Sequence, residues 1–503
     1  MEYGPKRECP LIGLEPAGTA VFLLVIGVLL AVGVASSRPS ARLGVPLTLV
    51  FLLVGILAGS EGIGRIAFED YHLTYRLGTA ALVVILFDGG LQTPMRGVRL
   101  VAAPALVLAT LGVVGTAGIT GLTAHFLGYS WPEALLIGAI VSSTDAAAVF
   151  SVLSASGTQL RRRIGLTLEV ESGFNDPTAV ILTTALTANA IAAKSLTAFG
   201  VAREVVIELV IGAVLGYAIG RGGRWMIARL RLPASGLYPA FTIGLACLAY
   251  GLPTLVHGSG FLAVYIAGLA VGNGPLAHST NLRRVHDAMG WLAQVGMFLM
   301  LGLLVFPTRL IDVAPVGLTI GLTIALVARP LVVALCLLPF RYNWRELLYV
   351  GFVGLRGAVP IVLATIPVMA HVAGGRELFD VVFFVTVVGA IIPGATVPHI
   401  TRLLGLESTS PPRPKTTIEI DAQSTSGVEL HSYYVHASLA VAGECLRNIP
   451  FPEGASVTVI EREGELIAPS ADLELQPGDH VFVLASRVDR AFIELLFGIA
   501  EDQ

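Results

Sequence analysis

The chain has 503 residues, of which 54% are hydrophobic and 13% are charged. Soluble globular domains carry about 25% charged residues, so the composition excludes an ordinary soluble enzyme and favours a polytopic membrane protein. The net charge of -3 offers no basic excess, and nucleic acid is not an expected partner. The four cysteines are scattered, without a CxxC pair, so we expect neither a disulfide nor a structural metal.

Apolar stretches recur along most of the chain, each near the length of about 20 residues that crosses a bilayer as a helix. They predict a polytopic α-helical membrane protein with about thirteen transmembrane helices, at residues 17–36, 43–60, 75–94, 100–127, 131–153, 163–191, 203–229, 236–252, 257–273, 286–306, 313–339, 346–371 and 378–401.

The loops between these stretches alternate in charge. One set of alternate loops holds sixteen arginines, from Arg38 to Arg402, and the opposite set holds six lysines and arginines. The positive-inside rule places the richer set in the cytoplasm. We therefore expect a multi-pass protein of the cell inner (cytoplasmic) membrane. Its segment 1–16, which lacks the pattern of a cleaved signal, would lie outside, and its C-terminus inside.

The last fifth of the chain differs in composition from the transmembrane part, residues 17–404. Residues 405–427 are rich in Ser, Thr and Pro, which is typical of a linker. Residues 428–503 are charged and alternating, and a hairpin of Ser456–Ile460 with Leu466–Ala468 is expected there, followed by a strand near residue 480. We predict a small soluble α+β domain on the cytoplasmic side.

Ionisable residues inside the spans need a function or a partner, because a charge at the bilayer centre costs about 2.5 to 3.5 kcal/mol on insertion scales. Those that we single out are Asp88, Asp145, Glu171, Asp176, Arg329 and Arg356. In the sixth span, Ser172 and Asp176 share a helix face, whereas Glu171 points about 140° away from Asp176. Two carboxylates on different faces suggest two different roles. Pro177 has no N–H, so the Gly173 carbonyl beside Asp176 is left available to a cation or a water.

The twelfth span is a poor continuous helix, because three glycines between Gly351 and Gly357 are followed by Pro360. A broken helix with a cation, here Arg356, at the break is typical of an ion site at the bilayer midplane. The Ser142–Asp145 segment offers short oxygen ligands, and a matching break in the fifth span is expected there.

Four motifs together carry a family resemblance: Phe87-Asp88-Gly89-Gly90, Thr144-Asp145, Asn175-Asp176 and Gly354-Leu355-Arg356-Gly357. With them, residues 17 to about 404 resemble the monovalent cation:proton antiporter 1 family, in its NhaP-type branch. The resemblance implies a homodimer in membrane lipid. Each protomer would have a dimerisation bundle and a core domain with inverted repeats, in which the discontinuous fifth and twelfth spans cross.

The resemblance also implies the ion site. Asp176 would bind the ion and carry the proton, Asn175 would stabilise it, and Thr144, Asp145 and Ser172 would surround it. The transported monovalent cation would then sit at Asp176, Thr144 and Ser172, with no other metal.

Three further residues receive roles from the resemblance. Glu171 would pair with Arg329, and Arg356 would neutralise helix ends or Asp145 at the crossing. Asp88 would be a funnel or accessory residue, although many relatives have Glu at its position.

The C-terminal domain resembles the C-terminal lobe of regulators of potassium conductance, the TrkA-C type. Antiporters with this appendage resemble potassium/proton exchangers more than sodium ones. The resemblance implies regulation, dimerisation and a small anionic ligand such as a nucleotide at residues 428–503, with no other cofactor.

We therefore predict an antiporter, not an enzyme, that exchanges K⁺, or Na⁺, for H⁺ with electroneutral 1:1 stoichiometry by alternating access. A channel gated by the C-terminal domain is one alternative, against which no TVGYG-like filter occurs. A proton-coupled solute symporter is another, and a saturating flux driven uphill by a proton gradient would distinguish an antiporter from a channel.

Overall fold

The computed structural model describes residues 17–35, 46–192, 198–230, 232–234, 236–274, 279–408, 428–452, 454–462, 464–486 and 489–498. The predicted outer segment 1–16 and most of the predicted linker, residues 409–427, lie outside the described residues. The chain divides into two compact units, residues 1–408 and 409–503.

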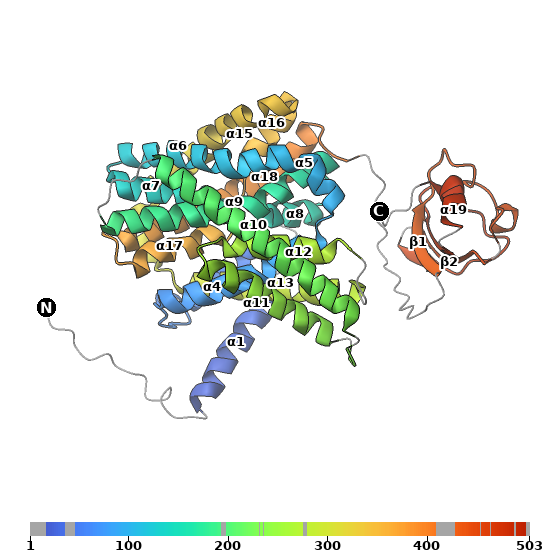
Figure 1. Cartoon of the computed structure of the whole chain (residues 1–503), viewed down its shortest axis with the longest axis horizontal. Helices are drawn as coiled ribbons and strands as arrows, with labels where there is room; N and C mark the ends of the chain where they lie inside the picture. The colour runs from blue at the N-terminus through green and yellow to red at the C-terminus, as the bar shows by residue number, and fades with distance from the viewer. Residues whose placement is uncertain are drawn as a thin grey trace. The chain divides into compact units, whose positions relative to one another are not determined.

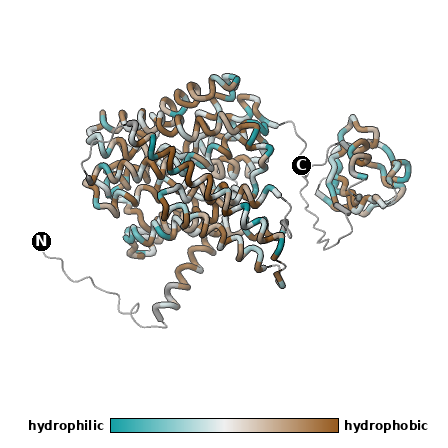
Figure 2. The backbone as a smooth tube through the Cα atoms, viewed as in Figure 1, coloured by the Kyte–Doolittle hydropathy of each residue, from teal (hydrophilic) through white to brown (hydrophobic). Residues whose placement is uncertain are grey.

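The first unit is a helical bundle (Figure 1). Apolar residues cover most of its helices (Figure 2), and six of the described helices are long and apolar enough to cross a membrane. The first helices are α1 (Ala17–Ala35), α3 (Leu47–Ala58), α4 (Tyr71–Gln92), α5 (Met95–Val107), α6 (Val113–Phe126), α7 (Trp131–Ile140), α8 (Ala146–Ala155) and α9 (Arg162–Ala192). The later ones are α10 (Ala198–Arg229), α11 (Leu237–Leu255), α12 (Gly260–Gly272), α13 (Ser279–Leu303), α14 (Pro307–Thr323), α15 (Arg329–Leu337), α16 (Trp344–Phe352), α17 (Val359–Met369) and α18 (Gly375–Leu403).

Two of the predicted spans are broken in the middle. Residues 141–145 separate α7 from α8, and residues 353–358 separate α16 from α17. Each broken span follows a long helix interrupted by a π-helical turn, η1 (Leu108–Gly112) or η2 (Ile324–Ala328). Each also precedes a long helix with an internal proline. This repeated order agrees with the predicted internal repeats. The two π turns were not predicted.

Close helix packing accounts for part of the glycine content. Gly212, Gly216 and Gly220 form a stripe along α10, which packs on α12. A Cβ atom at any of the three would lie 2.5 to 2.6 Å from a carbonyl oxygen of α12 or of Ser259 just before it, so a larger residue would push the helices apart.

The second unit contains a four-stranded sheet in the order β1-β4-β2-β3, with every pair antiparallel. Its elements are β1 (Val428–Tyr434), β2 (Ser456–Arg462), β3 (Glu465–Ile467), β4 (His480–Ser486), the short 3-10 helix η4 (Leu446–Asn448) and α19 (Arg490–Phe497). The predicted hairpin and the following strand are confirmed, and β1 is an additional strand. Tyr433, Val481, Ile493 and Phe497 belong to the core of the unit.

The end of the first unit extends further than the predicted boundary at residue 404. The Arg161 N–H donates to the Leu406 carbonyl at 3.1 Å, and the Ser408 N–H donates to the Gln159 carbonyl at 2.8 Å. Arg161 also donates from Nη2 to the Gly405 carbonyl at 2.8 Å. Residues 405–408 are therefore tied to the loop between α8 and α9 instead of starting the linker.

Candidate functional site

The two broken spans meet at their breaks. The Asp145 N–H, at the end of the first break, donates to the Leu355 carbonyl in the second at 2.8 Å. The Asp145 carboxylate caps α8 by accepting from the Ala148 N–H at 3.2 Å. Gly357 lies against the same side chain, and a Cβ atom there would overlap it. The crossing of two discontinuous helices is thus confirmed, and backbone as well as side-chain atoms form it.

One face of α9 is hydrogen-bonded to the first break. Ser172 Oγ donates to the Thr144 carbonyl at 3.0 Å and accepts from the Ala146 N–H at 3.3 Å. Asn175 Nδ2 donates to Thr144 Oγ1 at 2.6 Å. Asp176 follows directly, is 8% exposed, and lies within electrostatic range of Asp145. The structure therefore brings together the five residues that the sequence assigned to the ion site.

Glu171 faces a different neighbour. Its Oε1 atom lies 2.6 Å from Arg329 Nη2, and both residues are almost completely buried. Arg329 is the first residue of α15, directly after the π turn η2, and its side chain borders Gly354 in the second break. This placement agrees with the angle between Glu171 and Asp176 on α9, which points the two carboxylates at different partners.

Arg356 lies inside the crossing and is 4% exposed. Its Nε donates to the Val141 carbonyl at 3.2 Å, and its Nη1 donates to the Gly354 carbonyl at 2.6 Å. These carbonyls stand at the ends of α7 and α16, where helix dipoles place partial negative charge. Of the two partners expected for Arg356, the hydrogen bonds in the described part of the chain are to the helix ends.

The charges at the crossing do not balance. Asp145, Asp176 and Glu171 bring three negative charges, and Arg329 and Arg356 bring two positive ones. When all are ionised, one negative charge remains, which one monovalent cation or one proton would neutralise. The carboxylate, hydroxyl and carbonyl oxygens present are ligands that hard cations prefer.

Asp88 lies elsewhere. Both of its carboxylate oxygens accept from Gln92 Nε2 on the same helix, at 2.9 and 2.8 Å, and Gly290 of α13 packs beside it. Its contacts in the described residues are with α4 and α13 and not with the crossing.

Glu169 and Asp380, two further acidic residues, were not singled out from the sequence. On α9, Glu169 Oε1 lies 2.6 Å from Thr93 Oγ1, and Asp380 on α18 lies 3.4 Å from Arg309. Both stand inside predicted spans, which was the available signal. For Glu169 a second signal was its spacing of about two helical turns from Asp176.

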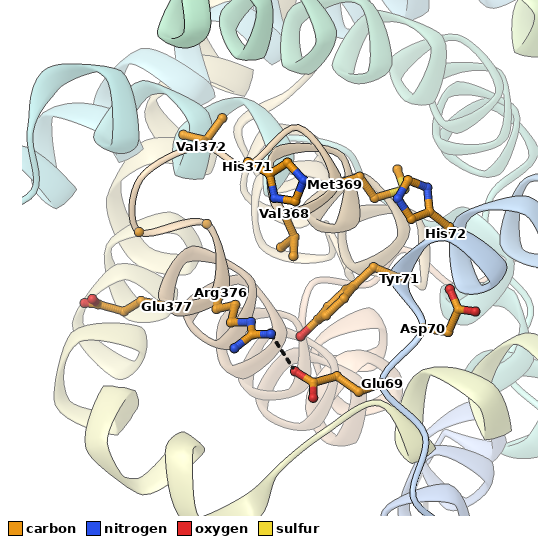
Figure 3. A pocket seen from close by; sticks show the side chains of 12 residues that line it. Glu69, Asp70, Tyr71, His72, Val368, Met369, His371, Val372, Arg376 and Glu377 are labelled. Atoms are coloured by element: carbon orange, nitrogen blue, oxygen red, sulfur yellow. Dashed lines mark ion pairs between the residues drawn. The ribbon is translucent and has the colours of Figure 1, made fainter. Parts of the chain in front are cut away.

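A separate cavity of about 530 Å³ lies where α17 ends and where α4 and α18 begin. Figure 3 shows Arg376 directed at Glu69 on one side of this cavity, an ion pair of 3.3 Å, and His371 and His72 on the other side. None of the residues that line the cavity belongs to the predicted ion site.

Comparison with known proteins agrees with this architecture. The family described as "Sodium/hydrogen exchanger, transmembrane" matches residues 18–403, and the TrkA-C domain family matches residues 430–497. The solved sodium proton antiporter MjNhaP1 from Methanocaldococcus jannaschii shares the fold, with a TM-score of 0.67 at 22% identity over 77% of this chain and 99% of that one.

Two similar antiporters match nearly the whole chain. The K(+)/H(+) antiporter NhaP2 of Shewanella sp. (strain ANA-3) is 39% identical over 489 residues, which are 96% of this chain and 84% of that protein. The K(+)/H(+) antiporter NhaP of Alkalimonas amylolytica is 38% identical over 469 residues, 93% of this chain and 81% of that protein. The predicted resemblance is thereby confirmed, and the chain is a multi-pass membrane protein that belongs to the sodium/hydrogen exchanger family.

Proposed function

We propose that the protein is a secondary active antiporter that exchanges a monovalent cation for protons. The main support for this proposal is the buried Asp176 beside the crossing of two broken helices. The charged residues there carry one more negative than positive charge when all are ionised. The K(+)/H(+) antiporters that are 38 and 39% identical to this chain support the same activity.

The mechanism is competition for one negative charge. Asp176 holds either a proton or a cation, and Thr144 and Ser172 supply further oxygens while Asn175 fixes the position of Thr144. Either occupant neutralises the buried group, and an empty site keeps a net charge that resists movement through the apolar part of the membrane. The core helices then expose the occupied site alternately to the two sides.

The charge balance favours exchange of one cation for one proton. Glu171 is held by Arg329 and does not cycle protons in this proposal, so no net charge crosses. A membrane potential of 100 mV contributes about 2.3 kcal/mol for each net charge moved, and an electroneutral cycle is indifferent to it.

Potassium is the proposed main substrate, with sodium as the second choice. The TrkA-C domain and the K(+)/H(+) antiporters named above support potassium. We further propose the inner membrane as the location, a homodimer in lipid, the N-terminus outside, and a cytoplasmic domain 428–503 that regulates exchange by binding a small anionic ligand such as a nucleotide.

The test uses purified protein in proteoliposomes with a dye that reports the pH gradient. Adding K⁺ or Na⁺ should dissipate an imposed gradient, and Asp176→Asn should abolish this in a folded protein because an amide cannot titrate. Currents recorded on a solid-supported membrane should be absent. Wild-type exchange in Asp176→Asn would refute the assignment of the site, a sustained current would refute the stoichiometry, and flux that cannot be driven uphill would indicate a channel.

A further inference from the structure

Glu169 lies outside the described site and contacts a residue at the end of another helix. It lies on α9, and its Oε1 atom is 2.6 Å from Thr93 Oγ1, just after the end of α4. The same Thr93 oxygen is 2.6 Å from the Gly89 carbonyl. Thr93 is 1% exposed, and the Tyr265 hydroxyl of α12 lies 3.5 Å from its Oγ1 atom.

The number of hydrogens limits how these contacts are made. The Thr93 hydroxyl has one hydrogen, and the Gly89 carbonyl can only accept. An ionised Glu169 could also only accept, and the two contacts at 2.6 Å would then have to share the single Thr93 hydrogen. Each contact has a hydrogen of its own when Glu169 carries a proton that it donates to Thr93, while Thr93 donates to Gly89. The contacts therefore fit a protonated Glu169.

Along α9, Glu169 lies between the ion site and the surface of the protein. Residues seven apart share a helix face, and Glu169 and Asp176 are separated by about 10.5 Å along the axis of α9. Ser172 lies between them on that face. Glu169 is partly exposed, whereas Asp176 is buried, and Glu169 is nearer to the arginine-rich start of α9 at Arg162.

We propose that Glu169 is a proton-transfer residue between Asp176 and the cytoplasmic side, an inference that rests on the proposed antiport. When the cation leaves, the Glu169 carboxylic acid gives its proton to the Asp176 carboxylate through bridging water. The Glu169 carboxylate then takes one proton from the cytoplasm. The same proton is passed on, so the exchange of one cation for one proton is unchanged.

The surroundings leave Glu169 without a nearby charged partner among the described residues. On α4, the Asp88 carboxylate is engaged by Gln92, and on α12 the titratable neighbour is Tyr265, whose ring packs on Phe174. The arginines of α5, Arg96 and Arg99, are exposed. The group that Glu169 contacts directly is thus a neutral hydroxyl, which can pass a hydrogen bond but cannot hold the carboxylate ionised by its charge.

The experiment separates proton movement from cation movement. Proteoliposomes with Glu169→Gln are assayed for K⁺/H⁺ exchange by dye and for ⁸⁶Rb⁺/K⁺ exchange by isotope, because the second reaction needs no proton. We expect the first rate to fall on the order of 100-fold, at the low end of what a positioned acid or base contributes. The second rate should stay close to that of the wild type.

Controls separate this proposal from the proposed function. Glu204→Gln removes an exposed carboxylate from α10 and should change neither rate. Asp176→Asn should lose both rates, and wild-type protein without K⁺/H⁺ exchange would refute the antiport itself. Equal loss of both rates in Glu169→Gln would make Glu169 a structural or cation-pathway residue and overturn the proposal, as would an unchanged K⁺/H⁺ rate. Thr93→Val, which keeps the carboxylate, should slow only the proton-coupled reaction, and slowing of both reactions would count against the proposal.

Discussion

Removal of one partner of the buried ion pair should destabilise the transmembrane unit strongly. Arg329 and Glu171 are 1% and 0% exposed, and their charged atoms lie 2.6 Å apart. In Arg329→Ala, the Glu171 carboxyl group loses its ion-pair partner and stays buried in a low-dielectric interior. The loss of one partner of such a pair costs about 3 to 5 kcal/mol. The expected result is a clearly lower melting temperature in detergent, measured by thermal unfolding of the purified protein.

The chain contains a matched control of the same residue types. Arg376 and Glu69 lie 3.3 Å apart, but their side chains are 68% and 40% exposed. Exposed pairs contribute about 0 to 1 kcal/mol, so Arg376→Ala should melt close to the wild type. The contrast between the two variants measures the effect of burial, because the deleted side chain is the same.

A double variant tests the cause of the loss. Glu171→Leu combined with Arg329→Met removes both charges and fills much of the same volume. Replacement of a buried pair by apolar residues is often neutral or stabilising by about 1 to 4 kcal/mol, so the double variant should recover much of the stability lost in Arg329→Ala. Equal melting of Arg329→Ala and Arg376→Ala would refute the reasoning.

Further outcomes are expected for substitutions at the site and for truncations. Gly357→Ala should abolish transport in proteoliposomes, because the new methyl group overlaps the Asp145 side chain, whereas Gly118→Ala on α6 has open space within 4 Å and should transport normally. Asn175→Ala removes the hydrogen bond to Thr144 and should weaken apparent cation affinity by about 0.5 to 1.5 kcal/mol, measured by cation titration of exchange; an unchanged affinity would contradict the role of Asn175. Truncation after Ser408 should preserve exchange but change its dependence on pH or ligand. Truncation after Gly405 should also lower the melting temperature, because it removes the contacts of Leu406 and Ser408 with the loop between α8 and α9.

Local rules predicted much of the site. Glycines between Gly351 and Gly357 disfavour a helix, and the structure is non-helical from residue 353 to residue 358. The angle between Glu171 and Asp176 around the axis of α9 predicted that these two residues have different surroundings, as they do. These features depend on residue type and helix geometry within one segment, so a single sequence contains them.

Features that depend on packing between distant segments were not predictable in this way. The π turns η1 and η2 consist of ordinary apolar residues, and the contact of Glu169 with Thr93 joins two helices far apart in the chain. Strand β1 does not alternate cleanly, and its register comes from pairing with β4 at the other end of the domain. The crossing itself was expected from family resemblance, because no local pattern states which two breaks meet.

The hydrogen bond from the Asp145 N–H to the Leu355 carbonyl uses main-chain atoms only. Substitution of either side chain leaves both of these atoms in place, unless the new residue is proline at position 145. The main-chain contact between the two broken spans therefore does not depend on which side chains surround it. Side chains around the site can therefore be exchanged, and the selectivity of the site altered, without loss of the main-chain contact that holds the two breaks together.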